Sequence, residues 1–309
     1  MTTVGLCLPQ LGEHIDREVV QAFSQNAEEL GFGGLWVQEH LFYPLNPRSG
    51  YAAIPGQPIP DPYRSTLAAT ETLMAAAAWT ERIEIGTSVL VAGYHRPLEL
   101  AQRLATLDVL SGGRLVAGFS VGWSEEEHEQ MDVDPHTRGR RCGELIEALI
   151  ACWGPDPVGF SGEFFTIPES VVRPKPLQRP RPRLMSGMRS AAGLARTATQ
   201  FDIWNPSRGD AREIKETLSG MQAARAPDAD PLQVYQRVFL EPSVPDPRKP
   251  SHGIDGVVAM IAQACAAGFA SVVVDANFWR EISSPRDWVE LPGRLHRACE
   301  AHGLPPSTG

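Results

Sequence analysis

The sequence predicts an α/β fold, a (β/α)8 TIM barrel with insertions at the carboxyl-terminal mouth of its strands. Short β-branched or apolar runs recur along the chain, and each is followed by a segment with helical periodicity, which is typical of a parallel sheet with helical crossovers. The length of 309 residues is one that such barrels reach as a single unit. The apolar fraction of 42% and the charged fraction of 21% are those of a soluble globular protein with a sizeable core. We therefore expect one domain over residues 1–309.

The first half of the chain contains well-defined strand–helix units. A strand is predicted over 4–8, and the helix after it ends at Gly31, because glycine commonly follows a helix. Segments 83–90 and 114–120 are predicted strands, and Pro97 lies in the first turn of the helix between them, where proline is tolerated. The apolar residues of the first helix form one stripe: Val19, Val20, Phe23, Ala27 and Leu30.

Two long irregular segments interrupt this pattern. The loop 43–62, between a strand at 35–38 and an alanine-rich helix at 67–79, is rich in proline and glycine, and loops of this length are usually functional. After a helix at 144–153, an insertion at about 154–183 contains prolines that exclude regular helix. We expect this insertion to lie over the barrel mouth.

The second half of the chain supplies the remaining four predicted strands, at 184–187, 202–204, 232–240 and 271–275, of which the last two have the highest β-branched content. Eight strand–helix pairs in a chain of this length indicate a closed barrel. The active site of such a barrel lies at the carboxyl ends of its strands.

Charge and cysteine usage exclude several classes of partner. A formal net charge of −9 argues against nucleic-acid binding and against anionic-membrane binding, since both need a basic surface. The start of the chain has no basic leader, and no segment reaches roughly 18 apolar residues, so we expect a cytoplasmic protein. Five scattered cysteines without a CxxC pair predict neither a disulfide framework nor a metal site. A small-molecule substrate is the expected partner.

Candidate functional residues follow the ends of the first strands. Glu39 and His40 place a carboxylate and an imidazole at the barrel mouth, where His40 would donate a proton; a packing or capping histidine is the alternative. Strand three ends in small and β-branched residues, at a point where a backbone bulge would press on a flat ring. Strand four runs into Gly122 and Trp123, which allow close backbone approach and offer an aromatic wall, or else an ordinary core tryptophan.

Strand five opens a helix through Gly187, Met188, Arg189 and Ser190, so backbone amides, a guanidinium and hydroxyls converge where phosphate binds readily. A basic concentration precedes it within this acidic chain, and either an anionic ligand tail or a solvated loop or interface accounts for it. Its members are Arg138, Arg140, Arg141, Arg173, Lys175, Arg179, Arg181 and Arg183.

An ordered set of motifs runs through the chain to about Trp204. It consists of IEIGTSVLVAGYHRPLELAQRLATLDVLSGGRLVAGFSVGW, LWVQEH before it, and RG, FSGEFF and RPKP after it. This set resembles the luciferase-like oxidoreductases, and most closely their actinobacterial deazaflavin-dependent branch. The resemblance implies coenzyme F420, or alternatively FMN, lying across the barrel mouth with its ring against the strand-three bulge, where Ser88–Val89 would be a cis peptide.

The same resemblance assigns roles to the candidate residues. His40, preceded by Glu39, matches the family histidine beside the reacting face, and the cofactor phosphate would meet residues 187–190. Trp123 stands where some sugar-phosphate dehydrogenases of the family carry a glutamate, which argues against their acid–base pair. The usual Asp-Gly-Trp reads Asp202-Ile203-Trp204 here, which puts any role of the missing glycine in doubt.

Hydride transfer between bound F420 and a small organic substrate is therefore the expected activity. The alternatives are an FMN-dependent monooxygenase that uses reduced flavin and oxygen, and a noncatalytic flavin-binding relative. A barrel metallohydrolase is disfavoured because a strand-end HxH pair and further carboxylate ligands are missing. A homodimer is expected by analogy with the family.

Overall fold

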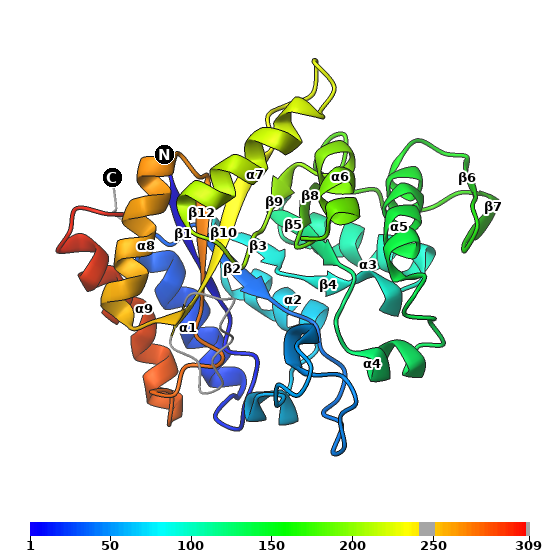
Figure 1. The fold of residues 1–309 in the computed structure, drawn as a ribbon. Coiled ribbons are helices and arrows are strands. Elements are labelled where there is room, and N and C mark those ends of the chain that lie inside the picture. The colour runs from blue at the N-terminus through cyan, green and yellow to red at the C-terminus, as the bar shows by residue number, and fades with distance from the viewer. Residues whose placement is uncertain (241–250, 307–309) are drawn as a thin grey trace.

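The computed structural model describes residues 1–240 and 251–306 and contains a closed barrel of eight parallel strands surrounded by helices (Figure 1). Every predicted strand is present. The barrel strands are β1 (Thr3–Cys7), β2 (Gly34–Val37), β3 (Glu84–Thr87), β5 (Leu115–Ser120), β8 (Arg183–Ser186), β9 (Ile203–Trp204), β10 (Gln233–Leu240) and β12 (Ser271–Asp275). Their order is β10-β12-β1-β2-β3-β5-β8-β9, and pairing of β9 with β10 closes the ring.

A helix follows each barrel strand and covers its outer face. These helices are α1 (Arg17–Glu29), α2 (Ala69–Trp79), α3 (Pro97–Leu110), α5 (Arg138–Trp153), α6 (Ala191–Gln200), α7 (Ala211–Ala223), α8 (Ile254–Ala267) and α9 (Pro285–Glu300). The stripe predicted for α1 is confirmed, because its first four members are buried and Leu30 packs against the same core. Asp16 fixes the start of α1 by accepting a hydrogen bond of 2.8 Å from the backbone N–H of Val19.

Short elements complete the chain. The third predicted strand is divided into β3 and β4 (Leu90–Val91), and the two residues between them face the mouth of the barrel. Other short elements are α4 (Glu125–Gln130), β11 (Ser251–His252) and the one-turn helices η1 (Tyr51–Ala53), η2 (Asp61–Arg64) and η3 (Ala92–Tyr94). No helix within 1–240 or 251–306 is both long and apolar enough to cross a membrane.

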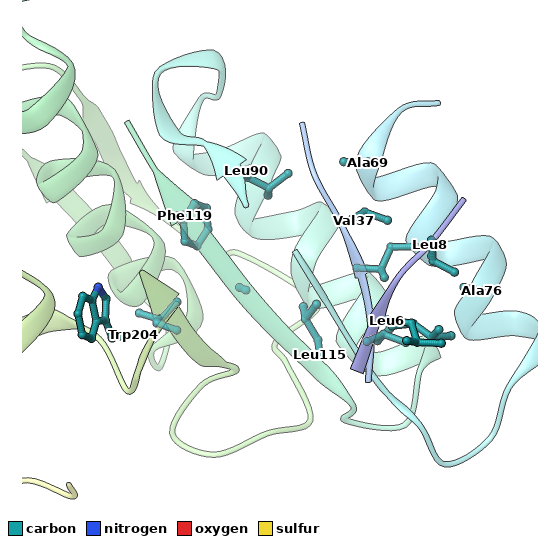
Figure 2. Packing of buried hydrophobic residues seen from close by; sticks show 14 of the residues in the cluster. Leu6, Leu8, Val37, Ala69, Ala76, Leu90, Leu115, Phe119 and Trp204 are labelled. Carbon is teal, nitrogen blue, oxygen red and sulfur yellow. The ribbon is translucent and has the colours of Figure 1, made fainter. Parts of the chain in front are cut away.

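The core has an outer layer between strands and helices and an inner layer inside the barrel. Figure 2 shows Leu8 and Val37 of the outer layer pointing toward the face of α2 that carries Ala69 and Ala76. The inner layer is centred on Trp36, whose side chain fills the barrel interior. Its ring meets Tyr235 edge-on with the centroids 5.7 Å apart.

Glycines make room for Trp36 inside the barrel. A Cβ on Gly86 would lie 2.3 Å from Cζ3 of the indole, and Cβ atoms on Gly5 and Gly34 would lie 2.4 and 2.8 Å from its Nε1. Because real carbon atoms do not approach so closely, these three strand positions require glycine while Trp36 occupies the interior.

The insertion 154–183 lies elsewhere than predicted. It contains an antiparallel hairpin, β6 (Val158–Ser161) and β7 (Thr166–Ser170), which lies beside α5 at the outer edge of the molecule (Figure 1). The chain then returns to the amino-terminal end of β5, where Gln178 Nε2 donates to the Leu115 carbonyl at 2.7 Å. The expectation that this insertion covers the mouth is therefore wrong. Because α5 runs away from the mouth and ends at Trp153, the insertion begins at the opposite end of the barrel.

Candidate active site

The carboxyl ends of the strands open into a cavity of about 680 Å³, a volume typical of small-molecule sites. Glu39 lines the cavity, and His40 does not. None of residues 154–183, all of which the structure describes, lines it. All eight predicted cofactor-binding residues do: Ser88, Val89, Gly122, Trp123, Gly187, Met188, Arg189 and Ser190.

The bulge between β3 and β4 crosses the cavity floor. The Ser88–Val89 peptide is cis, as the family resemblance predicts. The Ser88 hydroxyl donates to Asn205 Oδ1 at 2.8 Å, and its backbone N–H donates to the Val37 carbonyl at 2.6 Å. The Val89 side chain faces Gly187, since a Cβ on that glycine would lie 3.2 Å from Val89 Cγ1. The bulge is thus fixed to strands on both sides and presents a small apolar surface.

One wall of the cavity is suited to anions. Residues 187–190 lead into α6, and the Ser190 hydroxyl caps this helix by accepting a hydrogen bond of 3.1 Å from the Gly193 N–H. A helix N-terminus carries partial positive charge and unsatisfied N–H groups, so it favours phosphate. Besides Arg237 at the cavity floor, five arginines line the same cavity: Arg138, Arg140, Arg189, Arg196 and Arg208.

The basic concentration seen in the sequence is divided by the fold. Only Arg138 and Arg140 of its eight members line the cavity. Of the two interpretations left open by the sequence, the ligand tail therefore applies to these two arginines alone, because α5 and the insertion carry the other members away from the mouth. Several of these are paired elsewhere: Arg173 and Lys175 with Asp156, Arg181 with Asp202, and Arg183 with Glu84.

Glu39 fastens the backbone beside the bulge. Its carboxylate accepts a hydrogen bond of 2.7 Å from the Val91 N–H, and one of its oxygens lies 3.0 Å from His95 Nε2. Glu39 therefore contacts His95 and not the adjacent His40.

His40 lies one aromatic layer behind the cavity wall. Its Nδ1 is 2.8 Å from Glu127 Oε1, and both side chains are almost fully buried. The imidazole stacks on Trp123 with the ring centroids 5.8 Å apart, and the Tyr63 ring centroid is 4.3 Å away. Nε2 is buried and has no hydrogen-bond partner among the described residues.

Glu127 is a functional candidate that the sequence analysis missed. Its carboxylate lines the cavity and accepts hydrogen bonds from the Tyr94 hydroxyl and the Leu41 N–H, each at 2.5 Å, in addition to His40. Burial acts to raise the pKa of the Glu127 carboxyl, but these hydrogen bonds and the positive charge of protonated His40 outweigh it and leave the pKa below its ordinary value. Glu127 is thus an ionised partner for His40.

Helix α4 also holds the loop over the mouth. Glu126 accepts hydrogen bonds from the backbone N–H groups of Arg48 and Ser49, at 2.5 and 3.0 Å, and Glu129 pairs with the Arg48 guanidinium. Burial acts to raise the pKa of Glu126, but these and other hydrogen bonds lower it to about 2. The 43–62 loop and α4 are therefore fastened together above the cavity.

Arg237 ties several strand ends together at the cavity floor. Its guanidinium donates to the Ser88 carbonyl, to Gln38 Oε1 at 3.0 Å and to the Asp275 carboxylate, which is fully buried. Burial acts to lower the pKa of Arg237, but the Asp275 charge outweighs it and raises the pKa further above its ordinary value. The sequence signal for this residue was a charged side chain in the middle of the apolar strand 233–240.

The remaining wall is aromatic. Tyr51, Tyr63, Trp123 and Phe239 line the cavity, and Phe278 packs behind the two tyrosines. Among residues 1–240 and 251–306, no group of three or more His, Cys, Asp or Glu side chains could hold a metal ion.

Comparison with known proteins identifies relatives over most of the chain. The family model described as luciferase-like monooxygenase matches residues 3–248. An uncharacterised protein of Mycobacterium tuberculosis is 33% identical over 224 residues, which cover 70% of this chain and 78% of that protein. The FMNH2-dependent dimethylsulfone monooxygenase of Pseudomonas putida is 27% identical over 229 residues, which cover 73% of this chain and 58% of that enzyme. An F420-dependent secondary alcohol dehydrogenase has the same fold, with a TM-score of 0.72 and 16% identity over 97% of this chain and 99% of that one.

Proposed function

The chain belongs to the luciferase-like monooxygenase family, and we propose that it is an F420-dependent oxidoreductase that transfers hydride between the bound deazaflavin and a small organic substrate. The observation that carries the choice of F420 is the set of five arginines that line the cavity in addition to Arg237. FMN has a single phosphate, whereas F420 has a phosphate and a polyglutamate tail. Guanidinium groups bind phosphate and carboxylate groups through charge-assisted hydrogen bonds, so a wall that carries this many arginines suits a ligand with several anionic groups.

The residues present fit such a cofactor. The start of α6 and the arginines would hold its anionic groups, while Ser88 and Val89 would support its ring, with Gly122 and Trp123 beside it. When bound, the deazaflavin supplies the hydride chemistry, and the protein contributes position and exclusion of water. The loop held by α4 and the aromatic wall cover this part of the mouth.

His40 and Glu127 would handle the accompanying proton. Because Glu127 is ionised, the Nδ1 of His40 carries a proton and donates a hydrogen bond to this carboxylate. This bond fixes the tautomer and leaves Nε2 to take up or release a second proton, which would reach the cavity only when the Tyr63 and Trp123 side chains move apart. In this proposal Glu127 is a positioning residue for the imidazole.

Titration of the apoprotein with F420, and separately with FMN, under anaerobic conditions tests the cofactor proposal. We expect the absorbance and fluorescence of F420 to report tight binding, with FMN much weaker. A preference for FMN would overturn the proposal and favour the monooxygenase alternative, which the Pseudomonas putida relative supports. Oxygen consumption with reduced FMN and a substrate panel would then test that activity. A noncatalytic relative would bind cofactor without turnover in either assay.

Substitution His40→Ala tests the proton-handling role. We expect cofactor affinity to stay nearly intact, because the imidazole lies behind the cavity wall. Turnover should fall, because the variant lacks the group that handles the proton. His302→Ala is the matched control, since His302 is exposed and bonds only its own helix end. Equal turnover by wild type and His40→Ala would remove His40 from the mechanism.

Several expectations from the sequence stay predictions: a cytoplasmic location, a homodimer, and no binding to nucleic acid or membranes. Sedimentation velocity of the purified protein tests the dimer.

A further inference from the structure

We propose that the aromatic half of the cavity binds an uncharged aromatic carbonyl compound as substrate, with its ring against the tyrosine and tryptophan side chains and its oxygen toward Arg237. The inference rests on the proposed function, because it names the substrate class of the same site.

The aromatic side chains form one continuous wall. The ring centroids of Tyr51 and Trp123 are 5.6 Å apart, those of Tyr51 and Tyr63 are 6.0 Å apart, and those of Tyr63 and Trp123 are 6.4 Å apart. Phe239 lines the same cavity, and its ring lies 5.2 Å below the Arg237 guanidinium. Aromatic rings in such tilted and edge-on arrangements favour a further aromatic ring over an aliphatic group of equal size.

At the cavity floor the positive charge of Arg237 is balanced by Asp275, but only one of the two side chains borders the cavity. Arg237 lines the cavity, whereas its counter-ion Asp275 does not line it and has a fully buried side chain. A substrate therefore meets N–H donors of a pair that has no net charge. This arrangement suits a neutral oxygen acceptor, because a cation would meet the guanidinium first and a carboxylate would lose its hydration without an uncompensated positive charge in return.

Donors at the floor outnumber their acceptors in the described part of the chain. Nε of Arg237 and Nε2 of Gln38 are both buried without a hydrogen-bond partner there, and the two side chains are joined by the 3.0 Å bond from Arg237 to Gln38 Oε1. Buried donors normally find an acceptor. A carbonyl oxygen at this corner adds the missing kind of group.

Four probes of similar size separate the possible ligand classes. Acetophenone is a neutral aromatic ketone, cyclohexyl methyl ketone lacks its aromatic ring, benzoate is anionic, and benzyltrimethylammonium is cationic. Calorimetric titration of the whole protein should find that acetophenone binds about 2- to 10-fold more tightly than cyclohexyl methyl ketone. With saturating inorganic phosphate present to occupy the arginine wall, it should also bind at least about 10-fold more tightly than either charged probe. Equal or tighter binding of any other probe, or no binding of acetophenone, would overturn the proposal.

Two variants assign the two parts of the subsite. Tyr63→Leu should remove the preference for acetophenone over cyclohexyl methyl ketone. Arg237→Met combined with Asp275→Asn removes both charges together, so that no unpaired ion is left buried, and should weaken both ketones by the same factor while keeping the aromatic preference. Trp79→Leu, on the outer helix α2, is the matched control and should leave all affinities unchanged. Retained preference in Tyr63→Leu would refute the role of the aromatic wall.

Titrations with and without F420 or FMN distinguish failure of this inference from failure of the proposed function. Probe selectivity in a protein that binds neither cofactor would refute the proposed function alone. Cofactor binding in a protein that prefers benzoate or the aliphatic ketone would refute the substrate class alone.

Discussion

Removing one member of the Arg237–Asp275 ion pair should destabilise the protein far more than removing both. Asp275→Asn leaves a mostly buried guanidinium whose other acceptors among the described residues are Gln38 Oε1 and the carbonyl and hydroxyl oxygens of Ser88. Arg237→Met leaves a fully buried carboxylate that keeps, within the part of the chain that the structure describes, two hydrogen bonds from Asn277, each 3.0 Å long. Breaking a buried pair in this way costs about 3–5 kcal/mol.

The two single variants should differ in size. Arg237 borders the cavity, whose water partly solvates a cation left alone, so Asp275→Asn should cost about 3 kcal/mol. Asp275 has no such access, so Arg237→Met should cost about 5 kcal/mol. The double variant should lose no more unfolding free energy than the more destabilised single variant, which makes the coupling energy between Arg237 and Asp275 at least about 3 kcal/mol.

Urea unfolding followed by circular dichroism measures all four proteins, and the slope of the unfolding free energy against urea must stay the same for the comparison to hold. If the loss of unfolding free energy in the double variant equals the sum of the two single losses to within about 0.5 kcal/mol, the reasoning is refuted, because additivity means that the two charges do not interact.

Three other outcomes are expected. Hydrogen bonds depress the pKa of Glu126 in the folded state to about 2 despite its burial, so the ionised carboxylate stabilises the fold fully above pH 4.5. This contribution to stability is lost as the pH falls toward 2. Glu126→Gln should therefore flatten the pH dependence of the unfolding midpoint over this range. Gly86→Ala should destabilise the barrel by about 1–3 kcal/mol in urea unfolding, since its methyl group overlaps Trp36, and the loss should shrink in the background of Trp36→Leu. Glu127→Gln should lower kcat on the order of 100-fold with cofactor Kd nearly unchanged, whereas Glu39→Gln should lower kcat less, and steady-state kinetics with fluorescence titration compares them.

The barrel could be predicted because its signals are local. β-branched runs bounded by glycine and proline mark strands whatever surrounds them, so even the short segment 202–204 was found, of which β9 occupies two residues. The cavity-lining residues followed from the rule that strand ends face the mouth, and the cis Ser88–Val89 peptide followed from the family resemblance.

The parts that could not be predicted depend on contacts distant in sequence. His40 contacts Glu127 and not its neighbour Glu39, because α4 folds back over the end of β2. The path of the 154–183 insertion is set by the Glu144 carboxylate, which accepts hydrogen bonds from the backbone N–H groups at the hairpin turn. No sequence pattern near Glu127 or Glu144 indicates these contacts. Arg237 is different, since its charge within an apolar strand was visible in the sequence.

The attachment of the mouth loop to α4 has a consequence for changing what the protein accepts. Three carboxylates of α4 bind backbone or side-chain groups of residues 41–49, so the two segments act as one part although they are far apart in the sequence. A loop transplanted alone from a relative would place a foreign backbone against these carboxylates. Segments 41–53 and 124–130 exchanged together keep the hydrogen bonds between them, and retaining Glu127 keeps the bonds to His40 and Tyr94, so the two segments form a cassette that can be replaced while the barrel beneath stays unaltered.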